Sequence, residues 1–121
     1  MNGAFTLKQQ IANRAYGVQI GLEVEEYHGR PGVTFDFGML AEWKDAISFG
    51  AAYFFEQYSR GAYTNVHIRV VEGWYHVVDT STMLMFYATV QALCNVYGKQ
   101  CTLSIDAEGN FIIPRYMYAT E

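Results

Sequence analysis

The feature that most constrains the fold is a change in the hydrophobic period along the first half of the chain. Between residues 18 and 25 apolar side chains fall on every second position. In a strand such side chains share one buried face. Between residues 43 and 58 they recur instead at three- and four-residue steps, which is typical of an amphipathic helix. The chain must therefore combine a half-buried sheet with helices.

The same alternation predicts further strands, and clusters of glycine, proline and polar residues predict the turns between them. We expect the turn after the fourth strand to begin at Glu72-Gly73, directly before a second helical segment. The further strands are expected at residues 4–11, 33–37 and 66–70, and the earlier turns at residues 13–17 and 28–32.

A second helix is expected to end at Tyr97, because Gly98 fits the position that stops a helix. Asp79, Thr80 and Ser81 are all candidate N-caps. The segment is apolar around much of its circumference, so it should be buried more deeply than the first helix.

The C-terminal residues predict a hairpin, with strands at 101–105 and 111–118 around a turn at 106–110. Pro114 places the last strand on an edge, where a missing N–H costs little. The order β-β-β-α-β-α plus a hairpin predicts an α+β fold with one mixed sheet and both helices on one of its faces.

The length of 121 residues suits one domain spanning residues 1–121. Its net charge of -4 argues against a broad basic face of the kind that grips nucleic acid through phosphates. Any contact with RNA must then be local. The chain has no signal-peptide pattern and no run of about 20 apolar residues that could span a membrane, so we expect a cytoplasmic protein with no membrane partner.

The sequence offers little catalytic material. His28, His67 and His76 lack metal-ligand spacing, and Cys94 and Cys101 form neither a CxxC motif nor a disulfide framework. We expect two partly buried free thiols, no metal, no cofactor and no catalytic residue. No GxxxxGK[ST] phosphate loop is present either, so an enzyme is the least favoured class.

Three segments in fixed order carry a resemblance. They are Asn-Val-His-Ile-Arg-Val at 65–70, Gly-Trp-Tyr-His at 73–76 and Val-Asp-Thr-Ser at 78–81, before the apolar helix. This order resembles domain IV of elongation factor G and elongation factor 2, where a strand precedes Gly-Ser-Tyr-His-x-Val-Asp-Ser-Ser. The tetracycline-resistance ribosomal protection proteins are similar. The resemblance covers mainly residues 4–98, and residues 99–121 form the C-terminal hairpin. A ribosomal protein S5 domain 2-like fold is what it implies.

The resemblance also implies a binding site. In the family this domain enters the ribosomal A site, and the histidine loop lies at its tip near RNA. Carried over by position, the candidates for contact with RNA or the ribosome are Arg14, Tyr16, Gly73, Trp74, Tyr75 and His76, and Asp79 and Thr80 would cap the helix that braces the tip. The family's first tip loop is rich in glycine, and only Arg14 and Gly17 match it here.

Two functions follow as hypotheses. The first is a stand-alone module like domain IV, without GTPase activity, that binds the ribosome or structured RNA through the histidine loop. The second is a protein-interaction or oligomerisation domain that kept the fold, suggested by an excess of aromatic residues over what two helix faces need. The aromatic residues in question are Tyr53, Phe54, Phe55, Phe86, Tyr87, Tyr116 and Tyr118.

Overall fold

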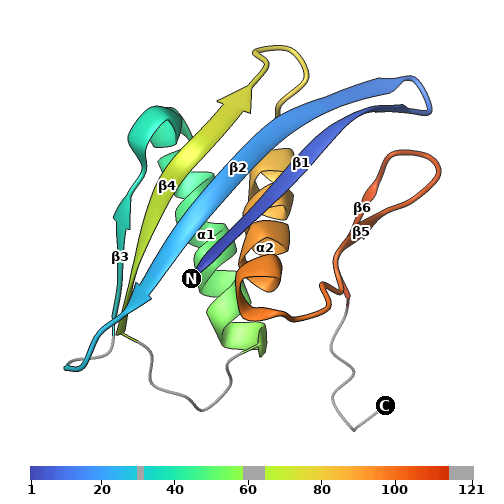
Figure 1. The fold of residues 1–121 in the computed structure, drawn as a ribbon. Coiled ribbons are helices and arrows are strands. Elements are labelled where there is room, and N and C mark those ends of the chain that lie inside the picture. Colours follow the sequence, from blue (N-terminus) through green and yellow to red (C-terminus); the bar gives the residue numbers. More distant parts are fainter. Residues whose placement is uncertain (30–31, 59–64, 115–121) are drawn as a thin grey trace, which may run out of the picture.

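The computed structural model describes residues 1–29, 32–58 and 65–114 and has an α+β fold built on a four-stranded sheet (Figure 1). The strand order is β1-β2-β4-β3. β1 with β2 and β2 with β4 are antiparallel, whereas β3 with β4 is parallel, so the sheet is mixed as predicted. The strands are β1 (Asn2–Ile11), β2 (Arg14–Glu26), β3 (Gly32–Asp36) and β4 (Asn65–Tyr75).

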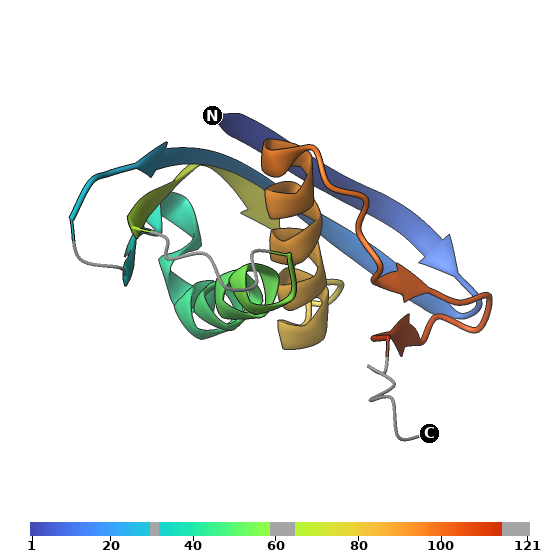
Figure 2. The same ribbon diagram turned by 90° about the horizontal axis from the view of Figure 1, so that it is seen from below.

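Both helices lie on one face of the sheet, which confirms the predicted layers (Figure 2). A short 3₁₀ helix, η1 (Gly38–Trp43), leads into α1 (Lys44–Tyr58), and α2 (Thr82–Tyr97) packs against α1, β1 and β2. α2 buries ten residues and α1 five, so α2 is the more deeply buried helix, as its all-round apolar pattern predicts.

The core forms where the alternate side chains of β2 meet the helices. Val18, Ile20 and Leu22 are fully buried and lie in one cluster with Leu84 and Leu93 of α2. Complete burial of such a side chain stabilises the fold by about 1.5–3 kcal/mol. The period-two pattern of the sequence thus has its expected physical basis.

A β-bulge in β4 changes which way its last residues point. Leu22 pairs with Val70 but Gly21 pairs with Glu72, so Val71 is left over. One extra residue reverses the alternation of the strand beyond it. Because Trp74 pairs with Gln19, it falls on the outer face of the sheet.

Two turn predictions are wrong. The first turn is confined to residues 12–13, where Ala12 has a positive φ of 55°, so Arg14, Tyr16 and Gly17 belong to strand β2. The glycine at position 73 does not turn the chain either, because β4 continues to Tyr75 in register with β2. Cross-strand pairing outweighs the local turn preference of glycine there.

The start of α2 confirms one of the three candidate caps and corrects the cap at Asp79 and Thr80 that the resemblance implied. Ser81 is the N-cap, since its Oγ accepts a hydrogen bond of 3.0 Å from the backbone N–H of Leu84. Asp79 and Thr80 precede the cap and do not fill it. At the other end, Gly98 adopts the left-handed conformation with φ 66°, which confirms the predicted stop.

The C-terminal hairpin is shorter than predicted and forms a sheet of its own. β5 (Ser104–Ile105) pairs with β6 (Phe111–Ile112) across the predicted turn. Pro114 follows β6 instead of lying within it, and residues 115–118 of the predicted strand lie outside the described residues. Phe111 docks the hairpin edge-on against Tyr16, with ring centroids 5.8 Å apart.

No helix in the described parts of the chain is long and apolar enough to cross a membrane.

Candidate functional site

Three connections meet at one end of the sheet: the β1–β2 turn, the β4–α2 loop and the β5–β6 turn (Figure 1). Hydrogen bonds join them. The backbone N–H of Gly17 donates to the carbonyl of Asp79 at 3.3 Å, and the hydroxyl of Tyr16 donates to the carbonyl of Gly109. Most of the candidate site residues from the sequence therefore lie at this end.

The tip loop, residues 76–80, is stabilised by hydrogen bonds within its own backbone and by the hydroxyl of Thr80. The N–H groups of Asp79 and Thr80 both donate to the carbonyl of His76, at 3.1 and 2.9 Å. The Thr80 hydroxyl accepts from His76 N–H at 2.8 Å and donates to the carbonyl of Gly17 at 2.5 Å. Thr80 thus braces the tip through a buried hydroxyl and not as a helix cap.

His76 points into solvent from this loop, with 61% of its side chain exposed. Its Nδ1 accepts a 3.3 Å hydrogen bond from Val78 N–H and lies 3.6 Å from Oδ2 of Asp79. The loop therefore occupies Nδ1 and leaves Nε2 as the ring nitrogen that can meet a ligand. Val77 and Val78, at the apex, are 85% and 82% exposed.

Trp74 lies on the outer face beside a hollow of about 220 Å³. A Cβ built on Gly17 would lie 3.3 Å from Cζ3 of the indole, so the ring covers that glycine. Lys8, which pairs with Gly17 across the hairpin, also lines the hollow. We call this the Trp74 hollow, and it is lined by Lys8, Tyr16, Gly17, Trp74, Tyr75, His76 and Asp79.

Tyr75 and Gly73 have mainly structural contacts. Tyr75 packs edge-on against Trp43 with centroids 5.3 Å apart, and its hydroxyl donates to Glu42. A Cβ on Gly73 would lie 2.7 Å from Cδ1 of Leu40. Of the predicted Trp74-Tyr75-His76 tripeptide, then, Trp74 and His76 face solvent, and Tyr75 is half-buried against η1.

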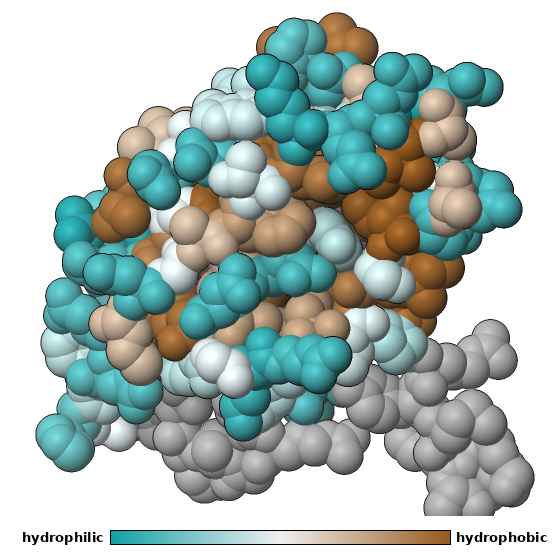
Figure 3. Space-filling view, turned by 45° about the vertical axis from the view of Figure 1, so that its right-hand side comes forward, coloured by the Kyte–Doolittle hydropathy of each residue, from teal (hydrophilic) through white to brown (hydrophobic). Residues whose placement is uncertain are grey.

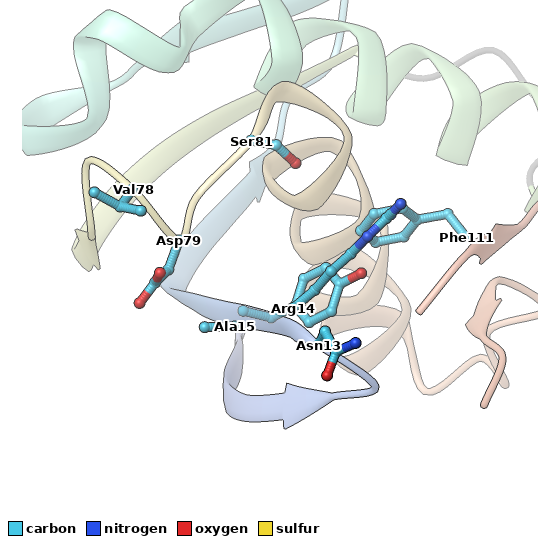
Figure 4. Close-up of a pocket in the computed structure, with 8 residues that line it drawn as sticks. Asn13, Arg14, Ala15, Val78, Asp79, Ser81 and Phe111 are labelled. Atoms are coloured by element: carbon cyan, nitrogen blue, oxygen red, sulfur yellow. The ribbon is translucent and has the colours of Figure 1, made fainter. Parts of the chain in front are cut away.

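A second hollow, of about 480 Å³, lies on the other side of Asp79 (Figure 4). The side chain of Arg14 extends across it toward Phe111 of the C-terminal hairpin. Arg14 brings a guanidinium to this hollow, and no ion pair joins it to another described residue. We call this the Arg14 hollow, and it is lined by Asn13, Arg14, Ala15, Tyr16, Val78, Asp79, Ser81 and Phe111.

The two hollows share Tyr16 and Asp79 and together form a polar, partly aromatic end to the molecule. In the space-filling view, hydrophilic and apolar side chains are mixed over the upper part of the molecule, and apolar ones gather along the right side of the view (Figure 3). Lys8 and His76 line the Trp74 hollow beside the exposed indole, and Arg14 lies in the neighbouring hollow. Such an arrangement can stack an unpaired base and bind its phosphates.

Sequence reasoning missed Lys8 and Phe111. Lys8 belongs to the site only because the hairpin register places it opposite Gly17, and Phe111 because its hairpin docks on Tyr16. The strand alternation around Lys8 could have indicated the face of the sheet on which it lies, but not that it pairs with Gly17.

In the described parts of the chain, no group of three or more His, Cys, Asp or Glu side chains could hold a metal ion.

The burial of the aromatic residues corrects part of the interaction hypothesis. Phe54, Phe86 and Tyr87 are buried in the core, and Tyr53 and Phe55 are partly buried against it. These five belong to the core or pack against it, and they are not a free aromatic surface. Tyr116 and Tyr118 lie outside the described residues.

Comparison with known proteins adds support for the fold. No family model and no curated protein matches the sequence. Among solved structures, a protein from Thermus thermophilus is similar, with a TM-score of 0.57 and 16% identity over 76% of this chain. The matched part spans 14% of the length of that protein. At this identity the likeness is one of fold alone.

Proposed function

We propose that this chain is an RNA-binding module, similar to domain IV of elongation factor G, that contacts ribosomal or other structured RNA through its tip loop. The observation that carries the proposal is the grouping of exposed Trp74 and His76 with Lys8 around one hollow, next to the hollow that Arg14 lines. The resemblance of residues 73–81 to the family motif supports the choice of the same loop. Binding needs no GTPase activity within this stretch of chain.

The physical chemistry of the site suits unpaired bases. Stacking of a base on an aromatic ring stabilises the complex by about 1–3 kcal/mol, whichever base it is. Lys8 and Arg14 would neutralise neighbouring phosphates, and His76 would donate from Nε2. Since the chain carries a net charge of -4, RNA should be repelled elsewhere and should bind only at this end.

Co-sedimentation with ribosomes tests the proposal. We expect the double variant Trp74→Ala/His76→Ala to lose about ten-fold or more in affinity, because it removes a stacking surface and a donor. The matched control is Tyr27→Ala/His28→Ala, an exposed aromatic and histidine pair beyond the other end of β2. The control should sediment like the unmodified chain. Equal binding by both variants would contradict the proposal.

A second function has one observation in its favour. Val77 and Val78 lie side by side at the apex of the tip loop and are almost fully exposed. Exposed apolar side chains on a braced loop can anchor a protein partner or a second copy of the chain. Light scattering at high concentration distinguishes this function, because a strict monomer would exclude self-association. Replacement of both valines by serine should then abolish any self-association through the tip loop that the unmodified chain shows.

A further inference from the structure

β1 forms an outer edge of the sheet, because the strand order gives it a neighbour, β2, on one side only (Figure 1). It is ten residues long, with Lys8 as its one charged side chain and no proline. The other edge strand, β3, has five residues and ends in Asp36. A long edge strand with few charges is open to pairing with a further strand. β1 is therefore the edge at which the sheet can be extended.

The hydrogen bonds of β1 show which of its backbone groups face this edge. The N–H of Val24 donates to the carbonyl of Met1 at 2.8 Å, and the amino group of Met1 donates to the carbonyl of Val24 at 3.0 Å. Odd-numbered residues thus point toward β2, and even-numbered ones point to the open edge. The carbonyl of Ala4 agrees, since it accepts from Nδ2 of Asn95 in α2 at 2.7 Å and keeps a second lone pair. Beyond Ala4, no hydrogen bond from the described parts of the chain occupies this edge.

A hollow of about 580 Å³ borders the same edge on the outer face of the sheet. Ala4, Gly21 and Glu72 follow one another across β1, β2 and β4, so the first two positions leave open space. The side chain of Glu72 lies over Gly21, because a Cβ built on that glycine would be 2.9 Å from Oε1 of Glu72. Glu23, also at the hollow, is paired with Arg69 at 2.7 Å. No cation among the described residues pairs with Glu72, so the hollow carries an unbalanced negative charge.

A second copy of the chain brings a cation to this hollow. When two β1 strands run antiparallel and Thr6 faces Thr6 of the other copy, Lys8 of each copy faces Ala4 of the other. Paired strands lie about 4.8 Å apart, and the four-carbon stem of a lysine is long enough to cross Ala4 and reach the carboxylate over Gly21. With Lys8 at the axis instead, two ammonium groups would face each other, which is unfavourable.

We propose that this protein self-associates through β1, in an antiparallel pair with Thr6 at the two-fold axis and Lys8 of each copy bound to Glu72 of the other. One strand carries both the lysine and the border of the hollow, so a two-fold axis forms both ion pairs at once. An unrelated extended peptide would leave one of these features without its complement. Pairing of two edges buries a small area, so the dimer should be reversible and depend on concentration.

Sedimentation equilibrium of the full chain at low salt, from micromolar to millimolar concentration, tests the pairing. We expect the unmodified chain to approach twice the monomer mass. Lys8→Glu and Glu72→Lys should each weaken association by about ten-fold or more, because each brings like charges together. The combined variant Lys8→Glu/Glu72→Lys should restore it to within about three-fold. Glu56→Lys, the same charge change at an exposed position of α1, is the control and should associate like the unmodified chain.

Disulfide formation checks the register. Residues that face each other in a hydrogen-bonded antiparallel pair have Cα atoms about 5.5 Å apart, which suits a disulfide. Thr6→Cys should therefore give a linked dimer on oxidation. Gln10→Cys lies on the same edge but away from the axis, and should link no more than the unmodified chain, whose own two cysteines set the background.

Lys8 also lines the Trp74 hollow, so the readout is mass and not RNA binding. A chain that stays monomeric at millimolar concentration would overturn the proposal. So would a dimer that persists in both single charge variants, or one that the charge swap does not restore. Loss of the dimer in Val77→Ser/Val78→Ser would assign self-association to the tip loop instead.

Discussion

Two glycines allow the close packing that orients the tip. The indole of Trp74 lies over Gly17, and the side chain of Leu40 fills the space where Gly73 lacks a Cβ. The resemblance placed Gly73 among the residues that contact RNA, but its surroundings explain it through packing alone. The motif marks the glycine but does not identify the side chain that packs against it. That side chain belongs to Leu40, which lies far from Gly73 in the sequence.

Replacement of Gly73 by alanine should destabilise the fold. Its Cβ would lie 2.7 Å from Leu40 Cδ1 and 3.0 Å from the carbonyl of Gln19, and such overpacking costs about 1–3 kcal/mol. Urea denaturation measures the loss. Gly32→Ala in β3 is the control, because nothing lies within 4 Å of its added Cβ. Equal stability of the two variants would show that the tip has more room than the structure gives it.

Thr80→Val should also destabilise the protein, by about 1–3 kcal/mol, because it leaves the N–H of His76 and the carbonyl of Gly17 without their partner. The shape of the side chain is kept, so the change isolates the hydroxyl. Thr82→Val, at the exposed start of α2, should change the free energy of unfolding by less than about 0.5 kcal/mol. Thermal unfolding of both variants against the unmodified chain makes the comparison.

At the scale of the elements, the sequence predicted the type and order of the strands and helices. It did not predict where each strand ends or in which register β2 and β4 pair. Alternation located the half-buried β2, and periodicity located α1 and α2, because burial imposes those patterns directly. The bulge at Val71 could not be predicted, since it depends on the register between β2 and β4. That one residue determines that Trp74 faces solvent, which the motif alone does not establish.

Two variants distinguish the observed cap of α2, Ser81, from the cap at Asp79 that the resemblance implied. Ser81→Ala should cost about 1 kcal/mol, because the Leu84 N–H loses its partner. Asp79→Ala should cost clearly less, since Asp79 caps nothing in the structure. Urea denaturation of the two variants decides between the cap positions. A larger loss for Asp79→Ala would instead place the cap at Asp79.

The turn of the C-terminal hairpin should respond to acid. Hydrogen bonds from the backbone N–H groups of Asn110 and Glu108 lower the pKa of Asp106 below its ordinary 3.8. Because the folded turn binds the proton less readily than the unfolded chain, its stabilisation is present above about pH 4 and is lost as the pH falls through the lowered pKa. The amide NMR signals of Asn110 and Glu108 should titrate with a midpoint below 3.8. In Asp106→Asn this titration should disappear.

At the scale of the whole molecule, one mixed sheet covered by two helices places three loops at the same end. Residues 8, 14, 74 and 76 come together there although they belong to three different strands and a loop. The resemblance placed His76 and Trp74 at this end, because both border the connection between β4 and α2, whereas Arg14, expected in a turn, lies in β2. It could not predict the docking of Phe111 on Tyr16, which closes the Arg14 hollow.

The proposed function depends most on where RNA binds. Amide chemical shifts of the ¹⁵N-labelled full chain, recorded at low salt during titration with a single-stranded RNA oligonucleotide, locate the contact directly. We expect the shifts to concentrate at residues 8, 14–17 and 74–80, and to weaken as salt is raised. Tyr27 and His28, at the far end of the sheet, should not respond. Saturable shifts centred elsewhere, or none at millimolar RNA, would contradict the account.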